Sequence, residues 1–352
     1  MTTPPPPHPT TRTSSVLWWR GSSGPLFGDF DGLLLDLDGV VYRGTDAIPG
    51  APEAIARVRQ LGGRVGFVTN NASRTPETVA AHLSSIGVPA TARDVVTSAQ
   101  AAAHLLAAQV GVGARVLAVG GEGLRAALRE RGLVPVESMA QEPAAVVQGF
   151  DGSVDWTGLA EVCYAVASGL PWVATNMDLT IPTARGLAPG NGSLVGVVAT
   201  TTTVQPTVAG KPALPLHREA TARMGAHRPL VVGDRLDTDI QAANTAGAGS
   251  VVVMSGVTDL RALCGARVVE RPWFVCEDVS GVLDRQPEIA HDAGDRWSCG
   301  GWSVTIRGGG LVLTGGGERS HAVRLVAAAS WSVTDMTGRA PDVERVATQL
   351  YG

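Results

Sequence analysis

The sequence predicts an α/β protein built on a doubly wound parallel sheet. Short apolar segments of strand length alternate with longer segments that carry a helical apolar face. Two of the apolar segments, Leu33–Leu37 and Leu230–Val232, run into aspartates. Strands of a parallel sheet are buried on both faces, and their carboxyl ends border the crevice in which open α/β sheets bind ligands. The acids at these strand ends therefore mark a candidate site.

The first half of the sheet follows from a β-α-β-α pattern. A helix is predicted over Pro52–Leu61, because its apolar residues share one face and glycines follow it. A strand over Arg64–Thr69 comes next. The second helix is expected to begin at Pro76 behind a capping Thr75 and to end at Gly87.

The sequence between Thr69 and Lys211 carries an α/β alternation of its own. Strands are predicted over 115–119, 144–148 and 172–175, with helices over 124–131 and 158–169. A single crossover connection needs far fewer residues. We therefore expect a folded insert, a cap domain over 76–199.

The sheet is expected to resume near residue 200. Helices over 212–224, 239–246 and 277–283 alternate with strands over 230–232, 250–254 and 273–275. The core domain is therefore predicted to comprise 28–75 and 200–284.

The two ends of the chain differ in composition from the core. Residues 285–352 are predicted to form a small α+β subdomain, with a hairpin over 297–314 and helices over 320–330 and 341–350. Residues 1–27 are rich in proline, threonine and serine, which predicts a disordered tail. A wrongly assigned start codon is the alternative explanation for that tail.

Composition excludes several classes of function. The formal net charge is −4 and no dense run of lysine and arginine occurs, so nucleic acid is not an expected partner. No apolar run reaches the length of a membrane span. The four cysteines form no CxxC pair, which favours the reducing cytoplasm over a zinc site or a disulfide framework.

Four short motifs occur in a recognisable order. They are Asp36-Leu-Asp38, Thr69-Asn70, Gly210-Lys211 and Val232-Gly-Asp234. An Asp-x-Asp strand end, a threonine strand end, a lysine and a further acidic strand end in this order resemble the haloacid dehalogenase superfamily. The resemblance implies a Rossmannoid core and phosphohydrolase chemistry that depends on Mg²⁺.

Within this resemblance, the first motif supplies the catalytic acids. Asp36 is expected to be the nucleophile and to form an aspartyl-phosphate, which splits hydrolysis into two easier steps. Asp38 lies two residues further on, so its side chain returns to the same side of an extended segment. It is expected to protonate the leaving alkoxide and then to deprotonate the attacking water. Taken alone, such a pair at a strand end is also a common cap or turn.

The acids also point to a metal ion. Asp36, Asp38 and Asp234 in one crevice would repel one another, and a hard dication relieves this repulsion. The resemblance implies that the carboxylates of Asp36 and Asp234 and the backbone carbonyl of Asp38 bind Mg²⁺. Asp239 matches a second acid of the last motif and is expected to lie behind the ligands. A charge at a helix N-terminus is the alternative for Asp239.

The remaining motif residues are expected to bind the substrate. Thr69 and Asn70 would hold phosphoryl oxygens through the hydroxyl group and the backbone N–H, next to a helix N-terminus that favours an anion. Lys211 would neutralise charge on Asp36 and on the transferring group. A lysine before a proline is otherwise an ordinary solvated residue.

A second resemblance lies in the insert. Ala174-Thr-Asn176-Met-Asp178 and Pro189-Gly-Asn-Gly192 are similar to the C2-type cap of subclass IIA, the p-nitrophenyl-phosphatase-like type. This implies that Asn176 contacts the non-phosphate part of the substrate, although a turn-rich loop explains the glycines equally well. Residues 30–283 resemble this subclass, and within it the actinobacterial glycerol-phosphate phosphatases.

The resemblance implies a hydrolase of small phosphomonoesters, with glycerol 3-phosphate as the first expected substrate. Phosphoglycolate, pyridoxal phosphate and p-nitrophenyl phosphate are alternatives. A 2-haloacid dehalogenase fits Asp38 poorly, because a departing halide needs no acid. A phospho-accepting receiver module would lack the insert, and an interaction protein acting through 285–352 is a further alternative. The resemblance also leaves room for a homodimer formed through the caps.

Overall fold

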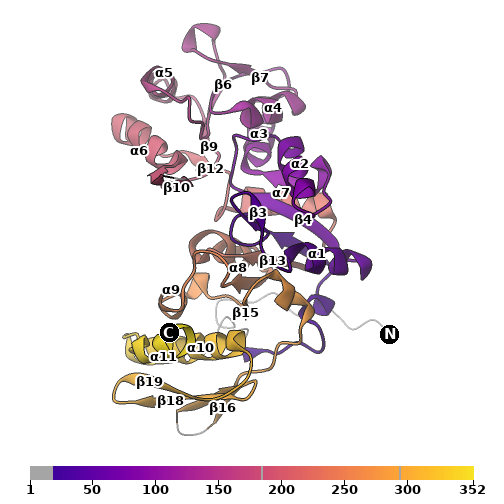
Figure 1. The fold of residues 1–352 in the computed structure, drawn as a ribbon. Helices are drawn as coiled ribbons and strands as arrows, with labels where there is room; N and C mark the ends of the chain where they lie inside the picture. Colours follow the sequence, from indigo (N-terminus) through magenta and orange to yellow (C-terminus); the bar gives the residue numbers. More distant parts are fainter. Residues whose placement is uncertain (1–18, 184, 293–294) are drawn as a thin grey trace. The chain divides into compact units, whose positions relative to one another are not determined.

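The computed structural model describes residues 19–183, 185–292 and 295–352 (Figure 1). Contacts divide the chain into two compact units. The first unit contains the residues up to Val65 and those from Ala226 to the end, and the second is Gly66–Gly225. The α/β class with parallel sheets that the sequence predicts is confirmed.

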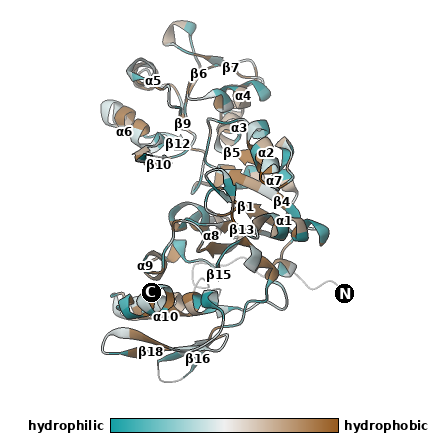
Figure 2. Cartoon of the chain, viewed as in Figure 1, coloured by the Kyte–Doolittle hydropathy of each residue, from teal (hydrophilic) through white to brown (hydrophobic). Residues whose placement is uncertain are grey.

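Four parallel strands form the centre of the first unit. They are ordered β15-β14-β13-β1, with bounds Phe274–Cys276, Gly249–Val253, Pro229–Gly233 and Gly32–Leu35. Every residue of these strands is buried, and Figure 2 draws β1 and β13 in its hydrophobic colours. Leu35 pairs with Val232, so β1 and β13 end side by side. The residues that follow both strands therefore emerge at one edge of the sheet.

Short elements precede, connect and follow these strands. They are β2 (Tyr42–Arg43), β3 (Asp46–Ala47), α1 (Ala51–Gln60), the π-turn η5 (Leu236–Ile240), α8 (Gln241–Ala246), α9 (Leu260–Cys264), and the 3₁₀ turns η2 (Leu26–Asp29), η6 (Val268–Glu270) and η7 (Val279–Leu283). The helix predicted over 277–283 is thus a 3₁₀ turn, in which Asp278 accepts a hydrogen bond from the Ser280 N–H.

The C-terminal subdomain is an antiparallel sheet covered by helices. Its strands are β16 (Ala290–Asp292), β17 (Arg296–Cys299), β18 (Trp302–Arg307) and β19 (Gly310–Gly315), paired in that order. The predicted hairpin is confirmed by β18 and β19, which pair from Trp302↔Gly315 to Arg307↔Gly310. The helices are α10 (Arg319–Thr337) and α11 (Glu344–Tyr351), drawn in yellow in Figure 1.

This subdomain shares one apolar core with the parallel sheet. Val252 of β14 and Leu263 of α9 belong to the same buried cluster as Trp297 of β17 and Trp331 of α10. Residues on both sides of 284/285 therefore pack together, and the subdomain boundary at this point stays a prediction.

The predicted tail is wrong for residues 19–27, and its first eighteen residues lie outside the described part of the chain. Leu26 and Phe27 are buried, and Trp19 packs against the shared core. The buried Arg324 guanidinium of α10 donates hydrogen bonds to the carbonyls of Arg20 and Pro287. Packing against a distant helix is what orders a segment whose composition favours disorder.

The second unit begins within β4 (Arg64–Thr69), which pairs in parallel with β5 (Val95–Thr97). Its helices in this part are α2 (Pro76–Ser85), α3 (Ser98–Val110) and α7 (Leu214–Met224), and a 3₁₀ turn η3 spans Ala92–Asp94. Helix α3 packs against α7 and also against α4 of the insert. This packing explains why the unit boundaries differ from the predicted ones at 75/76 and 199/200.

The insert has its own parallel sheet in the order β12-β9-β8-β6-β7. The bounds are Thr207–Val208, Trp172–Ala174, Ala145–Gln148, Arg115–Val119 and Val134–Val136. The elements around this sheet are α4 (Glu122–Glu130), the 3₁₀ turn η4 (Met139–Gln141), α5 (Trp156–Ala167), the hairpin β10–β11 (Thr180–Thr183 and Gly186–Pro189) and α6 (Asn191–Thr202). Helix α6 and this hairpin are absent from the sequence prediction. Among the described residues, no helix has both the length and the apolar character that a membrane span requires.

Candidate active site

Asp36 directly follows the last residue of β1. Its N–H donates to the carbonyl of Val232 in β13 at 2.9 Å, so the strand pairing continues into the Asp36-Leu-Asp38 motif. Asp36, Asp234 and Asp239 each present a carboxylate oxygen, and these oxygens lie within 4.8 Å of one another. Strand pairing therefore brings together acids that are far apart in sequence.

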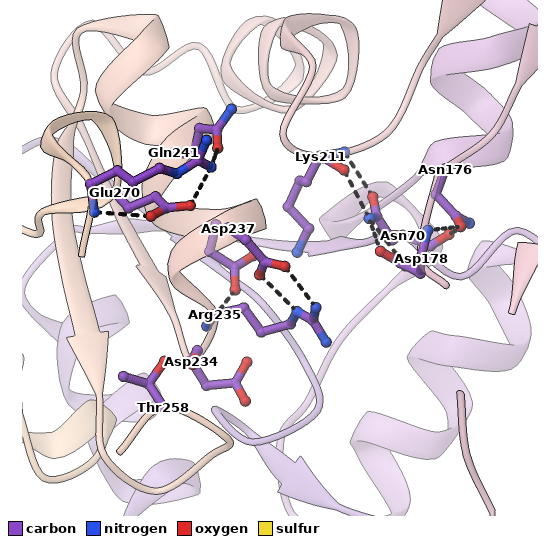
Figure 3. A network of polar contacts seen from close by, with 12 residues as sticks. Asn70, Asn176, Asp178, Lys211, Asp234, Arg235, Asp237, Gln241, Thr258 and Glu270 are labelled. Atoms are coloured by element: carbon purple, nitrogen blue, oxygen red, sulfur yellow. Dashed lines mark hydrogen bonds and ion pairs between the residues drawn. The ribbon is translucent and has the colours of Figure 1, made fainter. Parts of the chain in front are cut away.

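The Asp234 carboxylate is held by the turn that follows β14. Its Oδ2 accepts a hydrogen bond from the Val257 N–H at 2.9 Å. Its backbone carbonyl accepts one from Thr258 Oγ1 at 2.6 Å, and Figure 3 labels both Asp234 and Thr258. A Cβ atom at Gly39, where φ is +80°, or at Gly256 would overlap this carboxylate. Glycines on both sides thus let the backbone approach the acid closely.

Asp239 is buried and lies inside the turn η5. Its Oδ2 accepts a hydrogen bond from the Arg235 N–H at 3.1 Å, and Gly233 leaves no room for a Cβ beside it. Since its carboxylate lies with those of Asp36 and Asp234, Asp239 is a candidate metal ligand itself. Its position supports the catalytic interpretation over that of a solvated helix-terminal charge.

Asp38 stands in a tight turn after Asp36. The Gly39 N–H donates to the carbonyl of Tyr42 at 2.9 Å, and the Asp38 side chain is exposed. An exposed carboxylate beside the acid cluster can exchange protons with a bound molecule or with water. Its role as acid and base stays a prediction.

In the second unit, Asn70 and Lys211 are joined directly. Asn70 Oδ1 accepts from the Lys211 N–H at 2.8 Å, and Asn70 Nδ2 donates to the Lys211 carbonyl at 3.1 Å (Figure 3). The buried Lys211 ammonium group donates to the Val68 carbonyl at 3.2 Å. Thr69 follows Val68, and its Oγ1 accepts from the Asn71 N–H at 3.1 Å. The structure thus brings together the three predicted residues Thr69, Asn70 and Lys211.

Asn176 extends this network into the insert. Its Nδ2 donates to the carbonyl of Asn70 at 2.8 Å, and its Oδ1 accepts from the Asp178 N–H at 3.1 Å. Asn191, at the start of α6, donates from Nδ2 to the Asn176 carbonyl at 2.8 Å. The Asn176 amide therefore binds the backbone of this unit, and its predicted contact with the substrate stays a prediction.

Two residues of this network, Asp178 and Asn191, were not assigned roles by sequence reasoning. Both carboxylate oxygens of Asp178 lie 3.3 Å from Asn70 Nδ2. Both residues stand in the motifs that resemble a cap. However, the sequence does not reveal that Asp178 pairs with the Asn70 side chain or that Asn191 donates to the Asn176 carbonyl.

Comparison with known proteins agrees with this geometry. A model of haloacid dehalogenase-like hydrolases matches residues 33–134, and a second model of HAD-like hydrolases matches 208–282. The chain is 44% identical over 312 residues to the D-glycerol 3-phosphate phosphatase of Mycobacterium tuberculosis, which is 86% of each chain. The chain belongs to the haloacid dehalogenase-like hydrolases.

Solved structures in this family extend the likeness. A glycerol phosphate phosphatase from Mycobacterium tuberculosis in complex with magnesium is 41% identical and gives a TM-score of 0.81, over 93% of this chain and 98% of that one. A thermostable p-nitrophenyl phosphatase from Geobacillus stearothermophilus is 34% identical with a TM-score of 0.66, over 71% and 97%. The predicted membership in the p-nitrophenyl-phosphatase-like subclass is confirmed, and the chain is a phosphatase of this family.

The acid cluster of this haloacid dehalogenase-like hydrolase fits a hard divalent cation. Its three candidate ligands all offer carboxylate oxygens, and two of the side chains are buried. Buried carboxylates in such proximity are costly unless a cation compensates them. Oxygen donors alone suit Mg²⁺ or Ca²⁺, while Zn²⁺ usually takes nitrogen or sulfur ligands.

Proposed function

We propose that this phosphatase hydrolyses glycerol 3-phosphate through an aspartyl-phosphate on Asp36. The observation that supports it most is the meeting of Asp36, Asp234 and Asp239 at one edge of the parallel sheet. The sequence likeness to a D-glycerol 3-phosphate phosphatase supports the substrate. Relatives from Bacillus subtilis and Staphylococcus aureus, a 5′-nucleotidase at 40% identity and an acid sugar phosphatase at 39%, define the competing substrates.

In the proposed reaction, an Asp36 oxygen attacks phosphorus and the bond from phosphorus to the glycerol oxygen breaks. Asp38 gives its proton to that leaving oxygen. A water molecule then attacks the aspartyl-phosphate, Asp38 takes its proton, and phosphate leaves with the Asp36 carboxylate restored. Each step balances without an oxidant or a further substrate.

The other site residues are proposed to stabilise charge. Asp36, Asp234 and Asp239 would hold Mg²⁺, with the Asp38 carbonyl as a further ligand. When bound, the ion would offset the negative charge of the carboxylates and the phosphoryl oxygens. Thr69, the Asn70 N–H and the Lys211 ammonium group are proposed to bind those oxygens. The insert is proposed to act as the cap that selects the alcohol part of the substrate.

We infer that the enzyme works in the cytoplasm, since all four cysteines are free and three of them are buried. We also propose a homodimer formed through the caps, which light scattering of the purified protein tests by its mass.

The experiment is a phosphate-release screen over glycerol 3-phosphate, phosphoglycolate, pyridoxal phosphate, a sugar phosphate and a 5′-nucleotide, with and without EDTA. We expect the highest kcat/KM with glycerol 3-phosphate and no turnover in EDTA. Asp36→Asn should lower kcat by at least about 10³-fold without altering the circular dichroism spectrum, because a covalent nucleophile is lost. Turnover like that of the wild type in this variant would refute the mechanism, and a higher kcat/KM with another ester would refute the substrate.

A further inference from the structure

One turn in the first unit holds two parts of the acid site. In the turn after β14, Ser255 Oγ donates to the Gly39 carbonyl at 2.7 Å. Two residues on, the same turn supplies the Val257 N–H and the Thr258 hydroxyl that bind Asp234. The position of residues 255–258 therefore determines where the Asp234 carboxylate lies and where the loop after Asp36 lies.

This turn runs directly into helix α9. Asp259 caps the helix, because its Oδ1 accepts from the Ala262 N–H at 2.8 Å. Leu260, Leu263 and Cys264 are buried on one face of the helix. A helix of five residues has no stability of its own in water. Its position, and that of the turn before it, must come from what covers this face.

The C-terminal subdomain covers it. Helix α10 packs along α9, and the indole N–H of the buried Trp331 donates to the Leu263 carbonyl at 2.8 Å. At the surface, Arg261 forms an ion pair with Glu344 of α11. Among the described residues of the subdomain, the strong restraint on this short helix is therefore the packing on its buried face with the Trp331 bond, since an exposed ion pair contributes little.

The other side of the turn is less restrained. A cavity of about 500 Å³ separates the turn from α11, and Met254, Val257 and Tyr351 are among its lining residues. Space on this side means that no close packing there opposes a shift of the turn. A loss of packing against α9 would then shift Val257 and Thr258, the residues that bind Asp234.

We propose that Trp331 is a positioning residue for the metal site, through which the C-terminal subdomain sets the geometry of Asp234. The inference rests on the proposed function in one respect, that Asp234 helps to bind Mg²⁺. It assigns to the subdomain a task in the phosphatase reaction, without any catalytic group of its own.

The test compares two buried tryptophans of the same apolar core. Trp331→Phe removes the hydrogen bond to α9, whereas Trp297→Phe removes the same atoms from β17, where the indole nitrogen has no hydrogen-bond partner among the described residues. Changes to the residues that orient metal ligands weaken metal binding by about 10- to 100-fold. Because Trp331 acts from one step further away, we expect its variant to raise the Mg²⁺ dissociation constant about three- to tenfold, measured by calorimetry on EDTA-treated full-length protein.

Trp297→Phe should leave this constant within about twofold of the wild type, which sets the level of a merely structural effect. Thr258→Val tests the route. If Trp331 acts through the turn, adding Trp331→Phe to Thr258→Val should change the Mg²⁺ constant much less than it does in the wild type. Should Trp331→Phe fail to fold, Leu263→Val replaces it, with Leu313→Val of β19 as its control.

Equal Mg²⁺ constants in Trp331→Phe and the wild type would overturn the inference, as would equal losses in both tryptophan variants or independent effects in the double variant. Such results would leave the proposed phosphatase function standing. If wild-type protein bound no Mg²⁺ in the calorimeter, the proposed metal site itself would fail.

Discussion

The Asn70 side chain forms hydrogen bonds with both backbone polar groups of Lys211, the N–H and the carbonyl. Its oxygen accepts from the Lys211 N–H at 2.8 Å and its nitrogen donates to the Lys211 carbonyl at 3.1 Å. The Asn70 carbonyl in turn accepts from Asn176. One asparagine therefore links the proposed phosphate-binding strand, the lysine and the insert.

Asn70→Ala should lower kcat by about 10²-fold, because a shift of about 1 Å in a charged group near the reaction costs this much. Unfolding should become easier by about 1–3 kcal/mol, since the backbone groups lose their partners. The matched control is Asn244→Ala in α8, whose amide likewise donates to two carbonyls, those of Val269 and Arg271. It should lower stability and leave kcat unchanged. Equal kcat losses in both variants would contradict the role of Asn70.

The candidate site was predictable where chemistry and strand ends coincide. Asp36, Thr69 and Asp234 each follow or end an apolar strand, and parallel pairing then brings strand ends to one edge. The bonds that Asn176 and Asn191 donate were not predictable. Their partners are backbone groups of segments far away in sequence, and no local pattern records such pairs.

The helices of the fold likewise divide into those that a local pattern predicts in full and those that it predicts only in part. Helix α1 spans 51–60, close to its prediction, because one apolar face and the glycines after it define it locally. Helix α10 runs from 319 to 337, beyond the predicted 320–330, and it buries residues around most of its circumference. Its buried Arg324 and Ser330 break the apolar period, so the pattern alone ends the helix too early.

Lys211 is the only lysine of the sequence, which gives the proposed phosphate contact a chemical test. Lys211→Ala should lower kcat roughly 10²- to 10³-fold, because the charge on the transferring group loses its partner. Lys211→Arg keeps the charge with another shape and should retain part of the rate. A change confined to KM would speak against a role in the transition state. Reductive methylation should modify one side chain by mass spectrometry, and inorganic phosphate with Mg²⁺ should slow that modification.

A substitution at Gly256 tests how tightly the backbone confines Asp234 in the proposed metal site. A methyl group there would overlap the Asp234 carboxylate, so Gly256→Ala should weaken Mg²⁺ binding at least about tenfold. The control is Gly196→Ala in the middle of α6, where a Cβ meets nothing within 4 Å. That variant should keep its Mg²⁺ affinity and gain about 0.5–1 kcal/mol of stability, as alanine favours helices over glycine. Unaltered Mg²⁺ affinity in Gly256→Ala would show that Asp234 is not confined as described.

His217 of α7 predicts a loss of stability in mild acid. It is buried, its Nε2 has no hydrogen-bond partner among the described residues, and burial lowers the pKa of its imidazole to about 4 from 6.5. Between these values the unfolded chain binds the proton and the folded chain does not, so stability rises with pH. The stabilisation is complete above pH 6.5 and is lost as pH falls toward 4, by at most about 3 kcal/mol.

His217→Leu should remove this dependence, because leucine does not titrate and fits a buried helical position. Melting temperatures measured from pH 7 to pH 4 should fall less in this variant than in the wild type. The exposed His227 provides the control, since His227→Gln should follow the wild-type curve. If the melting temperatures of wild type and His217→Leu fell by the same number of degrees over this range, the neutral buried imidazole would not be a source of acid sensitivity. The cause would then lie with carboxylates such as Glu219. Burial raises the pKa of Glu219, but the hydrogen bonds from Arg223 and His104 outweigh burial and lower this pKa overall.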